Sequence, residues 1–470
     1  MVSCTPPGGL TRQGRVGAVL AKLGPMDRTL PTAPEPKPST EVLCRDYGCG
    51  REPQRQLTVI ERTSRAPRRA WWERCDLFWD QDAYAFQPAW RAHGHGAGGY
   101  VAGPFGGRAY QTEWVTDFAP CTSRLLRLSH HVRGVVAALA AWHQMTAVQL
   151  AAHIGYPASK VSVILLPMYE AGLIERAIYP RQGPWQPRRA HVYRLRLGEP
   201  LEAWLAQLDD SEWLGVGLGA PLTAAGHFVR HNLLVGELVL RLEEVAWAPL
   251  QAIFGERFAS SDRLFGASSR SAHRVFGDAC IVRADGLRIV VELVRRQRPA
   301  EVMAKMTTWG RLLSQAPRST LGTVVVFLNA SAPGRDHADR AVSLRRCHRY
   351  ALSTDALGTG LLGEDYARST IFTASWAEWF PAPHAISTEF AQLAVSYSDG
   401  KTWKRGFLLP GKSPNVLPFG PSEPRSWAKP ARVATDPAGA AGNGSSTPTR
   451  YYGLPPWFEG PVVSHSSPEP

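Results

Sequence analysis

Two short apolar segments around an Asp-Gly pair constrain the fold of this chain more than any other feature. They span 277–283 and 287–294, and each carries one carboxylate, Asp278 in the first and Glu292 in the second. Apolar runs of this length on either side of a turn signal predict the two strands of a β-hairpin. Buried carboxylates need partners, and two of them at one sheet edge are typical oxygen ligands of Mg²⁺.

The length of the hairpin loop decides whether the two carboxylates meet. A two-residue loop, Asp285-Gly286, would pair Asp278 with Leu293 and put the carboxylates on opposite faces. A three-residue loop, 284–286 with its glycine in the left-handed conformation, pairs Asp278 with Glu292 on one face. A metal site on this hairpin therefore requires the three-residue loop.

Composition and charge narrow the class of protein. The chain has 470 residues, 44% of them hydrophobic, enough for two or three domains of about 150 residues each. A net charge of +13 favours a polyanionic partner, although compositional drift toward arginine is an alternative reading. The sequence shows no signal peptide and no run of about 18 apolar residues, which predicts a cytoplasmic protein without a membrane partner. Seven irregularly spaced cysteines indicate reduced thiols.

Shifts in composition divide the chain into seven segments. Proline and glycine dominate both ends, which predicts disorder there, and aromatic side chains dominate the segment after the first. The expected segments are a disordered start at 1–55, an aromatic-rich module at 56–122, a helical module at 123–197, a linker at 198–220, an α/β domain at 221–380, a C-terminal extension at 381–409 and a disordered tail at 410–470.

Segment 123–197 has the pattern of three helices followed by a two-stranded ribbon. The second helix opens on Thr146 as N-cap and ends at Gly155. Helices are expected at 125–142, 146–155 and 157–172, and strands at 173–179 and 191–196. This order is similar to a winged helix-turn-helix, in which the third helix enters the major groove of DNA and the ribbon, or wing, lies on phosphates.

The winged-helix resemblance implies two sets of DNA contacts. The groove-facing candidates are Ser159, Lys160 and Ser162, and the candidates for backbone contact are Arg181, Arg188, Arg189 and Arg194. Pro167 lies within the third helix, where it costs about 3 kcal/mol unless the helix bends. A winged helix used for dimerisation or protein contact is the other interpretation.

Segment 221–380 predicts an α/β domain with a mixed sheet, because helical and strand patterns alternate in it. The expected order is helix, two or three strands, helix, strand, helix, strand. The elements are a helix at 227–244, an ambiguous segment at 254–263, the hairpin, a helix at 299–314, a strand at 322–329, a helix at 336–349 and a strand at 370–373. The whole chain is thus predicted to be an α/β (α+β) multidomain protein.

This order, with an acid on each hairpin strand, resembles the PD-(D/E)XK nuclease-like superfamily. Together with the preceding winged helix, residues 128–373 resemble the replication-relaxation family, which is associated with plasmid replication and mobile elements in actinobacteria and related bacteria. Gly277-Asp278 stands at that family's Pro-Asp position, Glu292 at its glutamate, and Lys305 and Trp309 at its lysine and aromatic positions. The implied function is DNA binding in plasmid or mobile-element replication or transfer. The implied partners are double-stranded DNA and replication or transfer proteins.

Val294 departs from the family pattern, because nuclease members carry lysine there and relaxation-type members often carry aspartate. In an active site, Asp278 and Glu292 would hold Mg²⁺ and Lys305, the only lysine between 160 and 401, would stabilise the attacking hydroxide of a nickase or endonuclease. Glu237 is a candidate third carboxylate or a surface residue.

In a degenerate site, which needs no cofactor, Asp278 caps a strand and Glu292 pairs with Arg288 or Lys305. A third possibility is a protein-interaction adaptor that does not bind DNA. The residues alone leave these alternatives open.

Overall fold

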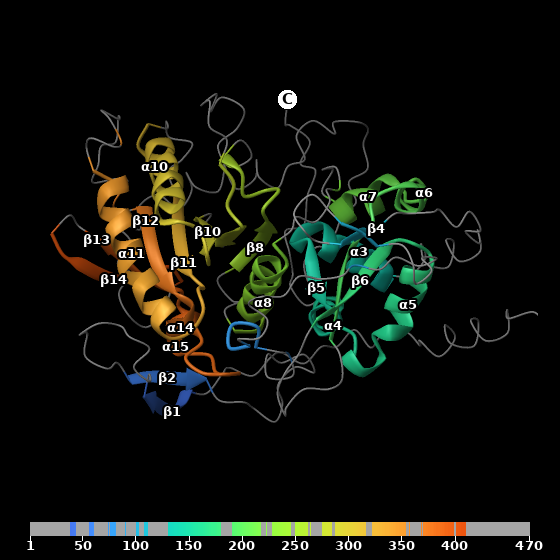
Figure 1. Cartoon of the computed structure of the whole chain (residues 1–470), viewed down its shortest axis with the longest axis horizontal. Coiled ribbons are helices and arrows are strands. Elements are labelled where there is room, and N and C mark those ends of the chain that lie inside the picture. The colour runs from blue at the N-terminus through green and yellow to red at the C-terminus, as the bar shows by residue number, and fades with distance from the viewer. Residues whose placement is uncertain are drawn as a thin grey trace, which may run out of the picture. The chain divides into compact units, whose positions relative to one another are not determined.

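The chain folds into a small helical module and a larger α/β layer (Figure 1). The structure, a computed structural model, describes residues 38–43, 56–60, 74, 76–80, 90, 100–102, 108–110, 130–179, 190–217, 222, 228–245, 250–261, 264, 275–283, 287–315, 322–353, 357, 368, 370–398 and 401–409. None of the described helices is both long enough and apolar enough to cross a membrane.

The helical module contains helices and a three-stranded antiparallel sheet in the order β5-β7-β6. Its elements are α3 (His130–Trp142), β5 (Gln144–Thr146), α4 (Ala147–Ile154), the 3-10 helix η3 (Ala158–Lys160), α5 (Ser162–Glu170), β6 (Ile174–Tyr179) and β7 (Ala190–Leu195). The predicted helices and the two ribbon strands are present, and β5 adds a third strand beside β7.

Capping residues fix the ends of α4 as the sequence predicts. The Thr146 hydroxyl accepts from the Gln149 backbone N–H, and the Gln149 side chain accepts from the Thr146 N–H, which together form a capping box. Gly155 ends the helix in the left-handed region, with φ 78°. α5 continues through Pro167 to Glu170, so the proline does not end it.

Two helices lie in the segment that the sequence predicts as a linker. They are α6 (Glu199–Leu205) and α7 (Asp210–Gly217). On α6, Leu201 and Trp204 are buried. Glu212 of α7 accepts from Arg133 of α3 at 2.7 Å. These helices therefore extend the core of the helical module, and 198–217 is not a simple connector.

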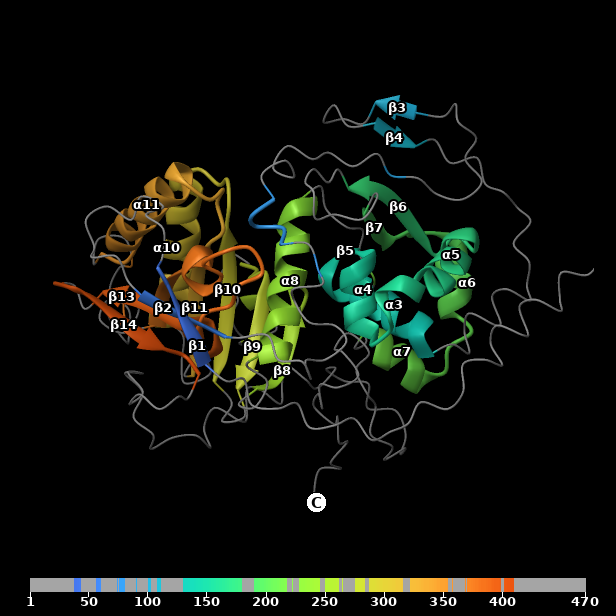
Figure 2. The same cartoon turned by 90° about the horizontal axis from the view of Figure 1, so that it is seen from below.

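The α/β layer is a seven-stranded sheet in the order β14-β13-β12-β11-β10-β9-β8 (Figure 2). Its strands are β8 (Leu250–Gly255), β9 (Ala279–Arg283), β10 (Arg288–Val294), β11 (Thr323–Asn329), β12 (Ile371–Ser375), β13 (Ala394–Ser398) and β14 (Trp403–Phe407). The central strands β10, β11 and β12 are parallel and the outer pairings are antiparallel. Every residue of β10 and β11 is buried, as interior parallel strands require.

Five helices accompany this sheet among the described residues: α8 (Val229–Val245), α10 (Pro299–Gln315), α11 (Arg335–Ala351), α14 (Trp376–Trp379) and α15 (Thr388–Ala391). The predicted alternation of helices and strands from 227 to 373 is confirmed, and the ambiguous segment at 254–263 contains the end of β8. The sheet also continues past residue 380, because β13 and β14 come from the predicted C-terminal extension.

Two short strand pairs precede the helical module. β1 (Pro38–Leu43) pairs with β2 (Gln56–Ile60), and β3 (Tyr100–Ala102) pairs with β4 (Arg108–Tyr110). The expectation of disorder over 1–55 therefore does not hold for 38–43. Its backbone hydrogen bonds come from β2, a partner that local composition does not reveal.

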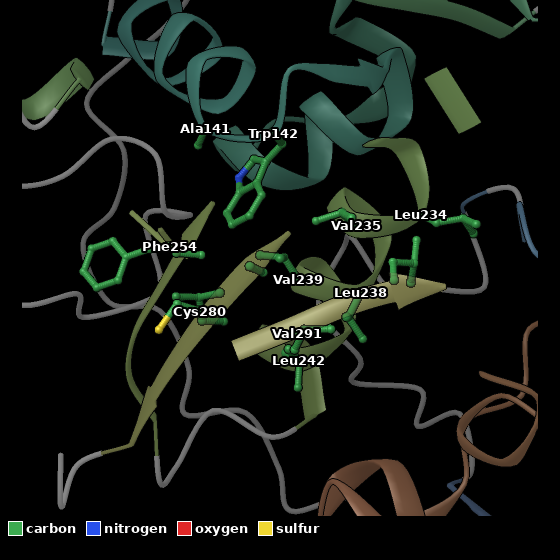
Figure 3. Packing of buried hydrophobic residues seen from close by; sticks show 14 of the residues in the cluster. Ala141, Trp142, Leu234, Val235, Leu238, Val239, Leu242, Phe254, Cys280 and Val291 are labelled. Atoms are coloured by element: carbon green, nitrogen blue, oxygen red, sulfur yellow. The ribbon is translucent and has the colours of Figure 1, made fainter. Parts of the chain in front are cut away.

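The helical module and the sheet share one core (Figure 3). Ala141 and Trp142 at the end of α3 pack against Gly255 at the end of β8. On α8, Gly236 lies against Met145 of β5, with a Cβ at this position 3.6 Å from the Met145 Cε. Helix α8 therefore packs against the helical module as well as contributing to the core of the sheet.

The two glycine contacts between the helical module and the sheet predict opposite effects of substitution on the free energy of unfolding. A Cβ at Gly255 would lie 2.2 Å from the Ala141 carbonyl oxygen, so Gly255→Ala should lower the free energy of unfolding by about 1–3 kcal/mol or more. Gly236→Ala, in a helix interior with space available, should raise it by about 0.5–1 kcal/mol. Urea unfolding of both variants measures the difference. Equal effects would contradict the close approach of α3 to β8.

Candidate functional site

The hairpin brings Asp278 and Glu292 opposite one another. β9 and β10 pair with Val291 opposite Ala279 and Arg288 opposite Val282, a register that places Glu292 opposite Asp278. The Asp278 N–H donates to the Val291 carbonyl at 2.8 Å. This is the register of the three-residue loop, one of the two alternatives that the sequence left open, although loop residues 284–286 lie outside the described part of the chain.

Each of the four carboxylate oxygens in this pair has a donor. His231 Nε2 lies 3.0 Å from Asp278 Oδ1, and the Leu293 N–H donates to Asp278 Oδ2 at 2.6 Å. Trp309 Nε1 donates to Glu292 Oε1 at 2.7 Å, and Lys305 Nζ to Glu292 Oε2 at 2.5 Å. The carboxylates are therefore held by protein groups on both sides.

Helix α10 supplies two of these donors. Lys305 and Trp309 are four residues apart, so they lie on one face of the helix, and both reach Glu292. The Lys305 side chain is 40% exposed and the Glu292 side chain 3%, so the cluster meets solvent at the lysine. The prediction that Lys305 reaches into the hairpin from the next helix is confirmed. Arg288, the other predicted partner, donates to the Leu264 carbonyl.

The charges of the cluster compensate one another. Burial alone would raise the pKa of Asp278, but His231, Lys305 and the Leu293 N–H lower it overall. Burial lowers the pKa of His231, and Asp278 more than restores it, so the imidazole pKa lies above its usual value. Burial, against the opposing effect of Lys305, raises the pKa of Glu292 to about 7. Two acids thus face one lysine and one readily protonated histidine.

His231 is the residue of this cluster that sequence reasoning did not select. It lies in the first turn of α8, 47 positions before Asp278 in the chain. His231 opens a His-Asn-Leu-Leu-Val run within the helix predicted at 227–244, and nothing in that run points to Asp278. A single histidine on an amphipathic helix gives no indication of its partner.

These residues do not fit a Mg²⁺ centre. Mg²⁺ prefers octahedral oxygen ligands, whereas all four oxygens here already accept from nitrogen donors. Two of those donors, Lys305 and protonated His231, are cations that compete with Mg²⁺ for the carboxylates. Val294, at the position of the missing third group, is apolar and buried. No group of three or more His, Cys, Asp or Glu side chains in the described ranges could hold a metal ion. The arrangement is that of a buried ion-pair cluster.

Glu237 is neither a third carboxylate of this cluster nor a surface residue. It is fully buried and accepts from Arg74 Nε at 3.1 Å, Arg241 Nε at 2.9 Å and Gln149 Nε2 at 3.2 Å. Arg241 also lies 3.2 Å from Asp76. This network ties the segment around Arg74 and the second helix of the helical module to α8, because partners from all three elements meet at Glu237.

The predicted DNA-contact residues have different surroundings. Ser159, Lys160 and Ser162 are exposed on η3 and at the start of α5. Arg194 donates to Glu175 at 2.7 Å and lies over the Trp90 ring, so it is held within the ribbon. Arg181, Arg188 and Arg189 lie outside the described residues. Val163 and Leu166 of α5 are also exposed, at 43% and 48%.

The raised pKa of Glu292 predicts that the stability of the fold depends on pH. A carboxyl whose folded pKa is about 7 rather than 4.5 stabilises the fold fully below the unfolded pKa and loses that contribution as pH rises through the folded value. The unfolding free energy of the wild type relative to Glu292→Gln should therefore fall by about 3 kcal/mol from about pH 4.5 to about pH 7.5. Denaturant unfolding at a series of pH values measures it, and a constant difference would contradict the raised pKa.

Comparisons of the chain with family models, with curated proteins and with solved structures find no match.

Proposed function

We propose that this protein binds duplex DNA through a winged helix-turn-helix formed by 130–195, and that its PD-(D/E)XK-like domain serves as a scaffold that does not cut DNA. The observation that carries the DNA-binding part is the exposed Ser159-Lys160 pair with Ser162 at the start of the third helix. The N-terminal residues of a recognition helix are those that reach base edges. Hydroxyl and ammonium groups there can contact bases and phosphates.

The order of elements supports both halves of the proposal. In the helical module a helix, a strand, two helices and two ribbon strands follow one another, as expected for a winged helix. In the sheet, α8 precedes the antiparallel strands β8, β9 and β10, and α10 connects β10 to the parallel strand β11. Asp278 directly precedes the second of these strands and Glu292 lies on the third, the placement on which the nuclease-like resemblance rests.

The exposed apolar side chains of α5 are compatible with a groove contact. Val163 and Leu166 lie on the outer side of the helix, where apolar groups can contact thymine methyl groups. The net charge of +13 supplies the nonspecific attraction to phosphates. We further propose membership of the replication-relaxation family, a cytoplasmic location, and a role in plasmid or mobile-element replication or transfer, with proteins of those processes as additional partners.

Fluorescence anisotropy of a labelled duplex of about 30 base pairs tests DNA binding. We expect log Kd to rise linearly with log salt concentration between about 50 and about 200 mM, because bound phosphates release counterions. Absence of binding at the lowest salt concentration would contradict the proposal and favour the adaptor function.

A Mg²⁺-dependent nickase is the second candidate, and one observation favours it. Lys305 contacts Glu292 and is partly exposed, which places the one lysine of this region beside the two acids that a nuclease would use. The engaged carboxylate oxygens and the buried Val294 argue for the scaffold instead. Nicking of supercoiled plasmid that disappears in Asp278→Ala, Glu292→Ala and Lys305→Ala variants would establish the enzyme.

A further inference from the structure

We infer that the groove between α10 and α11 binds an acidic amphipathic helix of a partner protein, an interaction beyond the proposed DNA binding. The two helices lie side by side, with Cys347 Sγ donating to the Pro299 carbonyl and Thr307 Oγ1 to the Ala351 carbonyl, each at 3.4 Å. Between them is an open groove of about 440 Å³, lined by residues that include Met303 and Tyr350. A partner helix requires a groove of this kind.

The floor of the groove is apolar where a solvated helix face would be polar. Met303 is 38% exposed and Tyr350 is 60% exposed. Ala304 of α10 is a further exposed apolar residue that lines the groove. Amphipathic helices normally direct such side chains toward a core. Methionine adapts its shape to apolar partners, and tyrosine is enriched at protein interfaces. The floor therefore suits the apolar stripe of a helix.

The margins of the groove are basic. Arg311 lines one end on α10, and two exposed arginines of α11 are near Tyr350 in the sequence, Arg346 one turn before it and Arg349 directly before it. Among the described acids of these helices, Glu301 lies beside Ala300 at one end of the groove and accepts from the Arg298 N–H, and the two aspartates of α11 fall in its first five residues. The described margin therefore carries more basic than acidic side chains, which fits glutamate or aspartate flanking an apolar stripe.

The side chains that line the groove distinguish a protein helix from nucleic acid as its occupant. Nucleic-acid interfaces are polar and strongly basic across their whole area, and single strands use aromatic platforms on which bases stack. Among the lining residues of this groove Tyr350 is the one aromatic side chain, beside methionine, alanine and threonine, and Arg311 lies at the margin, so successive bases would find no row of rings to stack on. An apolar floor inside a basic margin complements an amphipathic acidic helix.

The test uses a labelled peptide of about five helical turns, with leucine at helical spacing and glutamate elsewhere. Fluorescence anisotropy with the full chain should give a Kd on the order of 10 µM at low salt. Met303→Glu should weaken binding at least about tenfold and Arg346→Glu about fivefold. Arg335→Glu is the matched control, since it makes the same charge change at the opposite end of α11, and should leave binding unchanged.

A peptide of identical composition with the leucines at non-helical spacing should bind at least about tenfold more weakly. Circular dichroism melting of each variant verifies that it folds, as expected for replacements at exposed positions. Equal binding of the two peptides, no loss in Met303→Glu, or no binding of the helical peptide would overturn the inference. Loss of duplex binding in Met303→Glu would also overturn it, because the groove would then belong to the DNA interface.

Discussion

Glu237→Gln is expected to lower the free energy of unfolding by about 3–5 kcal/mol, the largest effect on stability that we predict. Removing one member of a buried ion network leaves its partners charged in a medium that solvates them poorly. Glu237 is contacted by Arg74 and Arg241, and both arginines are buried. Burial acts to raise the pKa of Glu237, but the two arginines lower it overall, so the carboxylate is ionised when the network is intact.

The expected outcome is a large fall in the midpoint of urea unfolding, with partial unfolding of the variant at room temperature. Asp339→Asn is the matched control, because Asp339 pairs with Arg335 in an exposed site, where such pairs contribute little. If both substitutions change stability by the same small amount, Glu237 does not hold the two arginines in place.

Lys160→Glu is expected to weaken duplex binding at least about 30-fold at low salt, the largest effect on function that we predict. The substitution replaces an attractive charge by a repulsive one on the third helix, where the proposed interface is most closely apposed to DNA. The side chain is exposed, so the fold should remain intact. The salt dependence of the remaining binding should also be shallower by about one unit of slope or more.

Arg335→Glu controls for the loss of positive charge in general. It makes an equal change on α11, at a side chain that is 93% exposed, and should reduce duplex affinity only slightly. Leu166→Asp should weaken binding as Lys160→Glu does, whereas Leu197→Asp, at a similarly exposed position outside α5, should not. Similar losses for the substitutions at Lys160 and Leu166 and for their controls would remove η3 and α5 from the interface.

Local rules were sufficient to predict the hairpin and the ends of α4. The two strands of the hairpin follow from the apolar runs on either side of an Asp-Gly pair, whereas their register remained open, because a two-residue and a three-residue loop fit the same sequence. The ends of α4 follow from Thr146 and Gly155, whose side chain and backbone act within one turn of the helix. Such features depend on residues that are close together in the sequence.

Partners that are distant in sequence could not be predicted. Arg74 reaches Glu237 across 163 positions, and His231 reaches Asp278 from another element, so neither contact leaves a local pattern. Strands β13 and β14 were missed for a related reason. They are the two antiparallel strands at one end of the sheet and contain mixed polar residues, and an apolar run does not mark them as it marks β11.

The donors of the carboxylate cluster explain why the sequence left two readings of the site open. The spacing of Asp278, Glu292 and Lys305 is compatible with a metal centre and equally with an ion pair. Only the three-dimensional arrangement shows that Lys305 and Trp309 occupy the oxygens of Glu292 while His231 and Leu293 occupy those of Asp278. The position of Val294 in a fully buried strand then leaves no room for a third polar group there.

Binding without cleavage is tested most directly by incubating supercoiled plasmid with the protein and Mg²⁺. The salt concentration is chosen so that the protein retards the plasmid in a gel. Removing the protein with detergent before a second gel shows the state of the DNA. The proposed scaffold function predicts plasmid that is retarded in the first gel and still supercoiled in the second. Nicked plasmid produced by the wild type and absent with Asp278→Ala would contradict it, and so would a plasmid that is not retarded at any protein concentration.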